Sequence, residues 1–294
     1  MNYLTYSYLL TPLHTGASTQ AGNLLGIARE AQTELPYIPS SSLRGKLRSS
    51  LESIAEIKSE AGSFFGERIK DGQQPTEGEV WFADATLLFF PVGSFSHQFL
   101  WITCPLWLSR WGRWLRNDQL NQLIEQWQSD LLTDGKKAIT SASGKQIYLQ
   151  GAILNEDNIK AIDIGNDWDI FKDIPDGNGI LDLKNKLVIL SNEDCGALVE
   201  IGLQREVRIT LDVNEKIVAN GSFRSEEAIP SETIMFFPWG MKPEKEANKT
   251  DNVRECLIKI LNDRLQFGGL EGLGRGWTEN QTIAVNKAVN KKGE

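Results

Sequence analysis

Hydrophobic and polar positions follow two kinds of pattern along this chain. Short stretches of alternating or continuous apolar residues are typical of strands, and they predict strands at residues 3–10, 99–104, 146–154, 186–190, 207–211, 232–237 and 281–285, with paired strands at 78–91. Apolar residues at helical spacing predict helices at residues 43–54, at 105–132 with a break near Asn117, in a short stretch ending at Gly202, and at 252–265.

The order of these segments predicts the fold class. Strand, loop, helix, strands, helix, strand is the order of an α+β sandwich of ferredoxin type, and such sheets commonly bind single-stranded RNA. We therefore expect one domain over residues 1–285, a ferredoxin-like or RRM-like palm with helical insertions, and a flexible tail at residues 286–294. The polar residues 61–77 are expected to be mobile, and the acidic residues 155–182 to form a surface insertion.

A projecting hairpin is predicted between two of the core strands. The strand at residues 207–211 is followed by a turn at Asn214, and Asn220-Gly221 is a strong turn dipeptide. Residues 222–230 are polar, and the strand pattern resumes at 232–237. The hairpin is placed at about residues 211–230, although an ordinary turn between two strands fits the pattern equally well.

Composition limits the class of protein. A chain of 294 residues can bury a large core, and 40% hydrophobic with 24% charged residues is ordinary for a globular protein. No signal peptide is recognisable, no run approaches the roughly 18 apolar residues of a membrane span, and we expect a cytoplasmic protein. The three cysteines are far apart and odd in number, which indicates neither a disulfide framework nor a zinc site.

A glycine-rich segment near the C-terminus is the strongest local signal. Five of the nine residues at 268–276 are glycine, against 26 in the whole chain. Such a cluster indicates positive φ angles or close approach of bare backbone to a ligand, and successive amides can bind an anion beside Arg275. The segment fits neither a Walker motif nor a dinucleotide fingerprint. A simple glycine-rich hairpin is the alternative.

The start of the first predicted helix is the second signal. Serines after Pro39 are good helix N-caps, and residues 35–51 carry three cations and no acid: Arg44, Lys46 and Arg48. Positive charge at a helix N-terminus suits phosphate, and Gly45, which costs about 1 kcal/mol relative to Ala, suggests close approach of the backbone. A solvated helix face is the alternative. The net charge of -8 counts against binding by overall charge but not against a local basic track.

Several motifs in chain order resemble the RAMP superfamily of CRISPR proteins. They are Leu10-Thr11-Pro12 with His14 and Gly16, Pro36 and Ser41-Ser42-Leu43-Arg44-Gly45, Gly78 with Asp84-Ala85, Phe90-Pro91-Val92 with Ser94, and the glycine segment at 268–276. The hairpin, with Glu226-Glu227 and residues 230–233, is most similar to the repeated backbone subunit of the Cmr-type (type III-B) effector complex. The resemblance runs through nearly the whole chain.

The resemblance implies a subunit that stacks in several copies along a CRISPR guide RNA. Its partners would be the guide, target RNA, copies of itself and other type III effector subunits, with the hairpin near residues 212–228 acting as a thumb that flips a base at regular intervals. The candidate RNA-binding residues are His14, Ser41, Arg44, Lys46, Arg48, Lys216, Gly268, Gly269, Gly272, Gly274 and Arg275. A globular domain with no RNA role is the rival that the net charge of -8 keeps open.

Catalysis is where this chain departs from the family it resembles. Family members cut target RNA with a metal-dependent aspartate a few residues before an Arg-Glu pair, whereas here Leu24 and Leu25 precede Arg29-Glu30 and offer no metal ligand. Glu30 or Glu34 could replace the aspartate in a subunit that cuts target RNA, with Mg²⁺ or Mn²⁺ as cofactor only if cutting occurs. Alternatively, His14 could act as general acid and base in a guide-processing ribonuclease. We expect no cofactor, no metal site and little or no cutting, and assign His14 to guide contact or loop structure.

Overall fold

The computed structural model describes residues 2–16, 24–67, 76–133, 135–164, 168–175, 182–209, 223–242 and 247–285. Strand β1 (Asn2–Leu9) lies at its centre, and its residues from Tyr3 to Leu9 are all buried. Tyr3 and Leu9 enter one hydrophobic core, and Leu4, Tyr6 and Tyr8 enter a second core on the other face of the sheet. The predicted tail at residues 286–294 lies outside the described residues.

Four antiparallel strands and two helices form the middle of the molecule. The strands lie in the order β15-β1-β13-β4, and helices α1 and α6 follow the first and third of them along the chain. This is the β-α-β-β-α-β arrangement of ferredoxin-like folds, and the α+β prediction is confirmed. The bounds are α1 (Ser40–Glu52), β4 (Thr86–Ser94), β13 (Ile234–Met241), α6 (Ala247–Leu261) and β15 (Trp277–Val285).

The sheet continues on both sides of this middle part. Within the described residues it contains ten strands, in the order β14-β15-β1-β13-β4-β5-β10-β6-β9, with β3 paired to β13. Two smaller sheets join β11, β12 and β2, and β7 and β8. The remaining strands are β2 (Leu24–Leu25), β3 (Val80–Phe82), β5 (Gln98–Thr103), β6 (Ala138–Thr140), β7 (Gln146–Leu149), β8 (Ala152–Asn155), β9 (Ile159–Ala161), β10 (Leu187–Leu190), β11 (Gln204–Arg208), β12 (Arg224–Ala228) and β14 (Leu265–Gln266).

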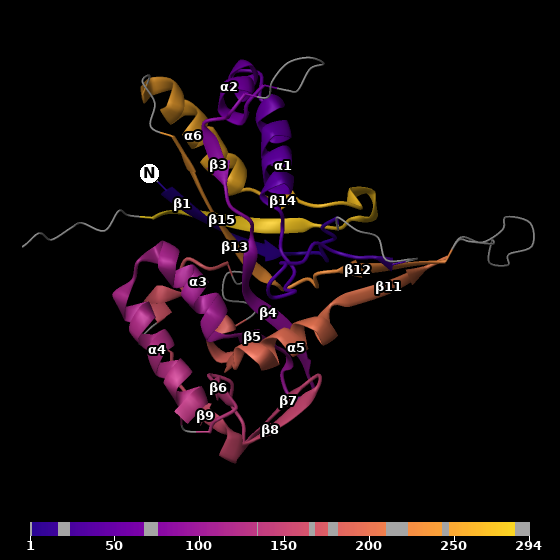
Figure 1. The fold of residues 1–294 in the computed structure, drawn as a ribbon, viewed down its shortest axis with the longest axis vertical. Helices are drawn as coiled ribbons and strands as arrows, with labels where there is room; N and C mark the ends of the chain where they lie inside the picture. Colours follow the sequence, from indigo (N-terminus) through magenta and orange to yellow (C-terminus); the bar gives the residue numbers. More distant parts are fainter. Residues whose placement is uncertain are drawn as a thin grey trace, which may run out of the picture.

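Helices cover both faces of the sheet (Figure 1). On one face lie α1 and α6, which bury leucines and valines at helical spacing: Leu43, Leu47, Leu51, Val253, Leu257 and Leu261. On the other lie α3 (Pro105–Leu115) and α4 (Asp118–Thr133), from which Trp111, Leu120, Ile124 and Trp127 enter the second core. The shorter helices are α2 (Ala61–Phe65) and α5 (Asn192–Gly202), with 3-10 turns at Lys58–Glu60, Glu156–Asn158, Trp168–Ile170, Leu183–Asn185 and Glu271–Leu273.

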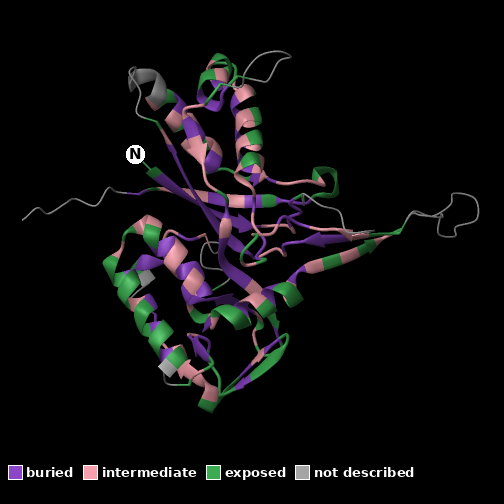
Figure 2. Cartoon of the chain, in the orientation of Figure 1, coloured by how far each residue is buried: buried purple, intermediate pink, exposed green. Residues whose placement is uncertain are grey.

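The inserted helices change the expectation of an RNA-binding palm. Strands β1 and β13 are buried on both faces (Figure 2), because α3 and α4 fill the side that an open ferredoxin-like sheet exposes. An RNA strand therefore finds no open sheet face at β1, and a binding surface has to lie at the loops beyond the strand ends.

Three local predictions are wrong. Residues 78–91 do not form strands paired with each other, since β3 and β4 both pair with β13. Residues 61–67 include α2, whose Phe64 and Phe65 are buried in the first core, and residues 68–75 lie outside the described part of the chain. Residues 155–182 are not only a surface insertion, because β9 joins the main sheet and Phe171 packs against Trp111 with ring centroids 5.6 Å apart. In each case the prediction failed because apolar residues in the segment pack or pair with residues that are distant in sequence.

The predicted hairpin projects from the body as β11 and β12 (Figure 1). Its first strand begins earlier than expected, and the polar segment at 222–230 contains β12, with Glu226 and Glu227 buried. The predicted tip, which includes Lys216, lies outside the described residues. At its base β12 also pairs in parallel with β2.

Candidate nucleic-acid interface

The segment after β1 joins the glycine-rich loop to the hairpin. Its residue Leu13 forms a bridge with Ile229 at the end of β12, and the next residue, His14, forms a bridge with Gly269. The amide of Gly269 donates to the carbonyl of His14 at 2.8 Å, and the amide of Gly276 donates to that of Pro12 at 2.9 Å. Three segments that are distant in sequence therefore meet at one end of the sheet.

His14 has a structural role in this arrangement. The ring is buried, and its Nδ1 lies 2.8 Å from the carbonyl oxygen of Glu227. A carbonyl oxygen can only accept, so Nδ1 donates in this bond. The bond holds the loop after β1 against β12, which supports the loop-structure assignment for His14.

The glycines of the loop divide into two groups. Gly268 (φ 81°) and Gly276 (φ 80°) are backbone requirements, because a Cβ at either position would collide with a carbonyl oxygen, of His14 and of Phe267 respectively. Gly272 and Gly274 are exposed, and a Cβ at either position would meet no neighbouring atom within 4 Å, although Gly274 also has a positive φ of 74°. The first pair closes the loop, and the second presents bare backbone to solvent.

Helix α1 lies beside this loop. The cationic helix start and the glycine segment must be neighbours if both bind the same RNA strand. The ammonium of Lys46 is 3.8 Å from a carboxylate oxygen of Glu271 in the loop. Ser41 and Gly45 are exposed on α1, and no protein atom comes within 4 Å of a Cβ placed on Gly45. No other segment of the described protein packs closely against the backbone of Gly45. This face of the helix is therefore open to a ligand.

The other predicted cations are held by the protein. Arg44 donates to the carbonyl oxygens of Val80 and Phe65, and Arg48 pairs with Glu52 on the same helix. Arg275 is buried and forms an ion pair of 2.8 Å with Glu206 of the hairpin. Of the four cations predicted on α1 and the loop, Lys46 is thus the one whose partner, Glu271, is itself exposed.

The N-terminus of α1 is capped differently from the prediction. Pro39 takes the N-cap position and no side chain caps from there. The amide of Ser40 instead donates to Asp84, 2.6 Å away, from the loop between β3 and β4. A carboxylate at a helix N-terminus is favoured by the same backbone dipoles that would favour a phosphate, so this amide already has an anionic partner.

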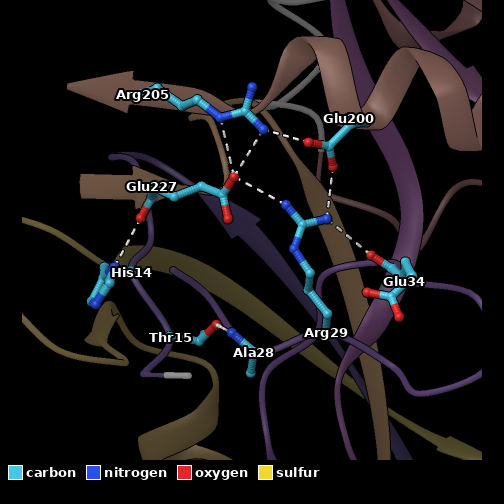
Figure 3. A network of polar contacts seen from close by, with 8 residues as sticks. All are labelled: His14, Thr15, Ala28, Arg29, Glu34, Glu200, Arg205 and Glu227. Atoms are coloured by element: carbon cyan, nitrogen blue, oxygen red, sulfur yellow. Dashed lines mark hydrogen bonds and ion pairs between the residues drawn. The ribbon is translucent and has the colours of Figure 1, made fainter. Parts of the chain in front are cut away.

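A network of charges fixes the base of the hairpin (Figure 3). The carboxylate of Glu227, buried, accepts from Arg29 at 3.0 Å and from Arg205 at 3.2 Å, and Glu200 at the end of α5 binds the same two arginines. Burial alone would raise the pKa of Glu200, but the hydrogen bonds from Arg29 and Arg205 outweigh it and lower the pKa. The network ties the loop after β1, α5 and the hairpin together.

The candidate catalytic carboxylates do not fit a metal ion. Both oxygens of Glu30 are bound by Arg110, at 2.8 and 2.9 Å, and Thr33 donates to the same carboxylate. Glu34 is exposed in a tight turn (φ 56°). Over the described residues no three His, Cys, Asp or Glu side chains gather as metal ligands do. Leu24 and Leu25 form β2 beside β12, and residues 17–23 lie outside the described part.

Two residues of this site were missed from the sequence. Glu206 pairs with Arg275, and no local signal marks it, since the two lie on different segments. Trp277 directly follows the glycine segment and is 41% exposed. An aromatic residue next to a glycine-rich, ligand-facing loop was a usable signal, but the nine tryptophans could not be sorted into core and surface from sequence.

Comparisons with known proteins agree with this architecture. Residues 8–279 match the RAMP superfamily, so the chain belongs to the RAMP superfamily, as its motifs predicted. No helix in the described part of the chain is long and apolar enough to cross a membrane.

Individual relatives match the chain from end to end. It is 29% identical to the CRISPR system Cmr endoribonuclease Cmr4 of Pyrococcus furiosus, over 99% of this chain and 98% of the relative. The crystal structure of oligomeric Cmr4 from Pyrococcus furiosus superimposes with a TM-score of 0.67 at 26% identity, covering 97% of this chain and 100% of that one. A chain of the type III-B Cmr-beta complex bound to cognate target RNA, solved by cryo-EM, gives 0.74 at 21% identity, covering 96% and 97%.

Proposed function

We propose that this protein is the guide-RNA-binding backbone subunit of a type III-B CRISPR effector complex. Several copies stack along one CRISPR RNA, hold its sugar-phosphate backbone and position the target RNA for base pairing. The partners are the guide, the target, further copies of this chain and other subunits of the complex. Membership of the RAMP superfamily and similarity to Cmr4 along the entire chain support this assignment.

The observation that carries the proposal is the meeting of α1 and the glycine loop. Lys46 is half-buried and lies close to Glu271, beside the bare backbone at Gly272 and Gly274. A phosphate can replace Glu271 as the partner of Lys46, because both are anions and Glu271 is exposed. Local positive charge and free backbone suffice for a single strand even on a body of net charge -8.

Recovery of RNA with the protein tests this function. Purified from its host, the wild-type chain is expected to carry short RNAs of uniform length. Lys46→Gln removes one phosphate contact, so RNA recovery falls and the slope of log affinity against log salt becomes shallower by about 0.7. Lys145→Gln is the matched control, since that lysine is 85% exposed and lies away from the loop. Equal RNA recovery in both variants, or none in the wild type, would contradict the proposal.

We further propose that this subunit holds target RNA without cutting it. The carboxylate of Glu30 is neutralised by Arg110 on both oxygens, and a metal ion would have to displace that guanidinium. The assembled complex, incubated with labelled target RNA and Mg²⁺, is expected to leave the target intact. Cuts at regular spacing that persist in Glu34→Ala and vanish in Glu30→Ala would assign cutting to this subunit and overturn the proposal.

A further inference from the structure

One large aromatic side chain at the glycine loop, that of Trp277, is partly exposed to solvent. Trp277 is 41% exposed, whereas its chain neighbours Gly276 and Thr278 are buried. Leu273, in the same loop, is 50% exposed. Because removing an indole from water is favourable, an exposed tryptophan at a proposed ligand site is a candidate contact.

The backbone that carries Trp277 is held in place. Its amide donates to the hydroxyl of Thr11 at 2.9 Å, and its carbonyl accepts from the amides of Leu10 and Thr11 at 2.8 and 3.3 Å. Gly276 before it adopts a φ of 80° that other residues rarely take. The backbone of Trp277 is therefore fixed by the segment after β1, so only the side-chain torsions of the indole have to be ordered when a ligand packs on the ring.

The direction of the side chain follows from the alternation along β15. Thr278 is buried and donates to the carbonyl of Leu265, so Trp277 points to the opposite face of the strand. Its register partner in β14 is Gln266, whose amide binds the carbonyls of Glu271 and Arg275 inside the glycine loop. The indole is thus attached to the same rigid loop that presents Gly272 and Gly274.

We propose that Trp277 is a stacking platform for an unpaired base of the guide RNA, while Lys46 binds a phosphate of the same strand. This inference rests on the proposed function. Every base has a π-face, so stacking needs no particular sequence, and bare backbone at Gly272 and Gly274 lets the strand approach closely. A cation beside the loop favours a nucleic acid over an apolar protein surface as the occupant.

Binding of base-bearing and abasic RNA separates stacking from phosphate contact. The full chain, freed of RNA, is titrated with a 5′-labelled single-stranded oligouridylate and with an abasic ribose-phosphate oligomer of the same length, at two salt concentrations. Trp277→Ala is expected to weaken oligouridylate binding about 5- to 100-fold without changing the salt slope, and to leave abasic binding unchanged. Trp277→Phe is expected to retain most of the affinity, which also controls for folding.

Phe95→Ala is the matched control, because Phe95 is 97% exposed in the turn between β4 and β5 and is not part of the loop. An equal loss on both oligomers, or no loss in Trp277→Ala, overturns the stacking role. If Lys46→Gln weakens binding and Trp277→Ala does not, only this inference fails, whereas a wild-type chain that binds neither oligomer overturns the proposed function as well. A variant that loses self-association but keeps RNA affinity assigns Trp277 to a contact between copies instead.

Discussion

Single backbone conformations decide the shape of the glycine loop. Gly276 combines a φ of 80° with a space that the carbonyl oxygen of Phe267 fills, and its own amide and carbonyl bind Pro12 and Phe267. Gly272, four residues earlier, has neither a positive φ nor a close neighbour. The same residue type therefore has a folding role at one position and leaves the surface open at the other.

Alanine at these two positions should separate the roles. Gly276→Ala adds strain at a left-handed φ and a collision with backbone, and is expected to lower the free energy of unfolding by about 3 kcal/mol. Gly272→Ala should change it by less than about 0.5 kcal/mol. Urea denaturation measures both, and equal stability of the two variants would contradict this account of the loop.

Among the contacts between elements, ion pairs join the charged side chains of the hairpin to the body, in addition to the pairing of β12 with β2. Glu227 and Glu200 bind Arg29 and Arg205, and Arg275 binds Glu206 from the glycine loop. The hairpin is thereby coupled to the glycine loop, which the RNA is proposed to contact. Buried ion pairs fix the relative positions of the segments that they join. Removing one partner strongly destabilises the protein, because the other charge is then buried without compensation.

The lowered pKa of Glu200 gives this attachment a pH dependence. A carboxylate with a depressed folded-state pKa contributes stability above its unfolded pKa, near 4.3 for Glu, and loses it as pH falls through the folded value. Wild type should therefore be more stable than Glu200→Gln at pH 7, with the difference closing below about pH 4. Thermal unfolding across this range measures it, with Glu125→Gln on the exposed side of α4 as control. A difference that persists unchanged at pH 3 would refute the ion-pair explanation.

At the scale of the whole molecule, the insertion of α3 and α4 decides where a ligand can bind. These helices occupy the second face of the ferredoxin-like sheet and bury Trp111 and Trp127 against it. The sheet thus becomes the core of the protein rather than its binding surface. The loops at one end of β1 and β15 remain, and there α1, the glycine loop and the hairpin meet.

The longer helices, the central strand and the family could be predicted from local features of the sequence. Alternation in β1 and helical spacing in α1, α3, α4 and α6 are local properties that depend only on which face of each element is buried. The glycine cluster and the ordered motifs are likewise local, so the RAMP resemblance could be read from them. Lys46 lies on the helix predicted there, 3.8 Å from Glu271 of the glycine loop.

Which charged and aromatic residues are available to a ligand depends on the packing of segments that are distant in sequence. Arg44 and Arg275 look like Lys46 in the sequence, but carbonyls of Val80 and Phe65 and the carboxylate of Glu206 occupy them. Those partners come from other segments, and burial depends on what packs against a residue rather than on its neighbours in the chain. For the same reason Trp277 could be told from the core tryptophans only once β15, the loop and the segment at 10–16 were placed together.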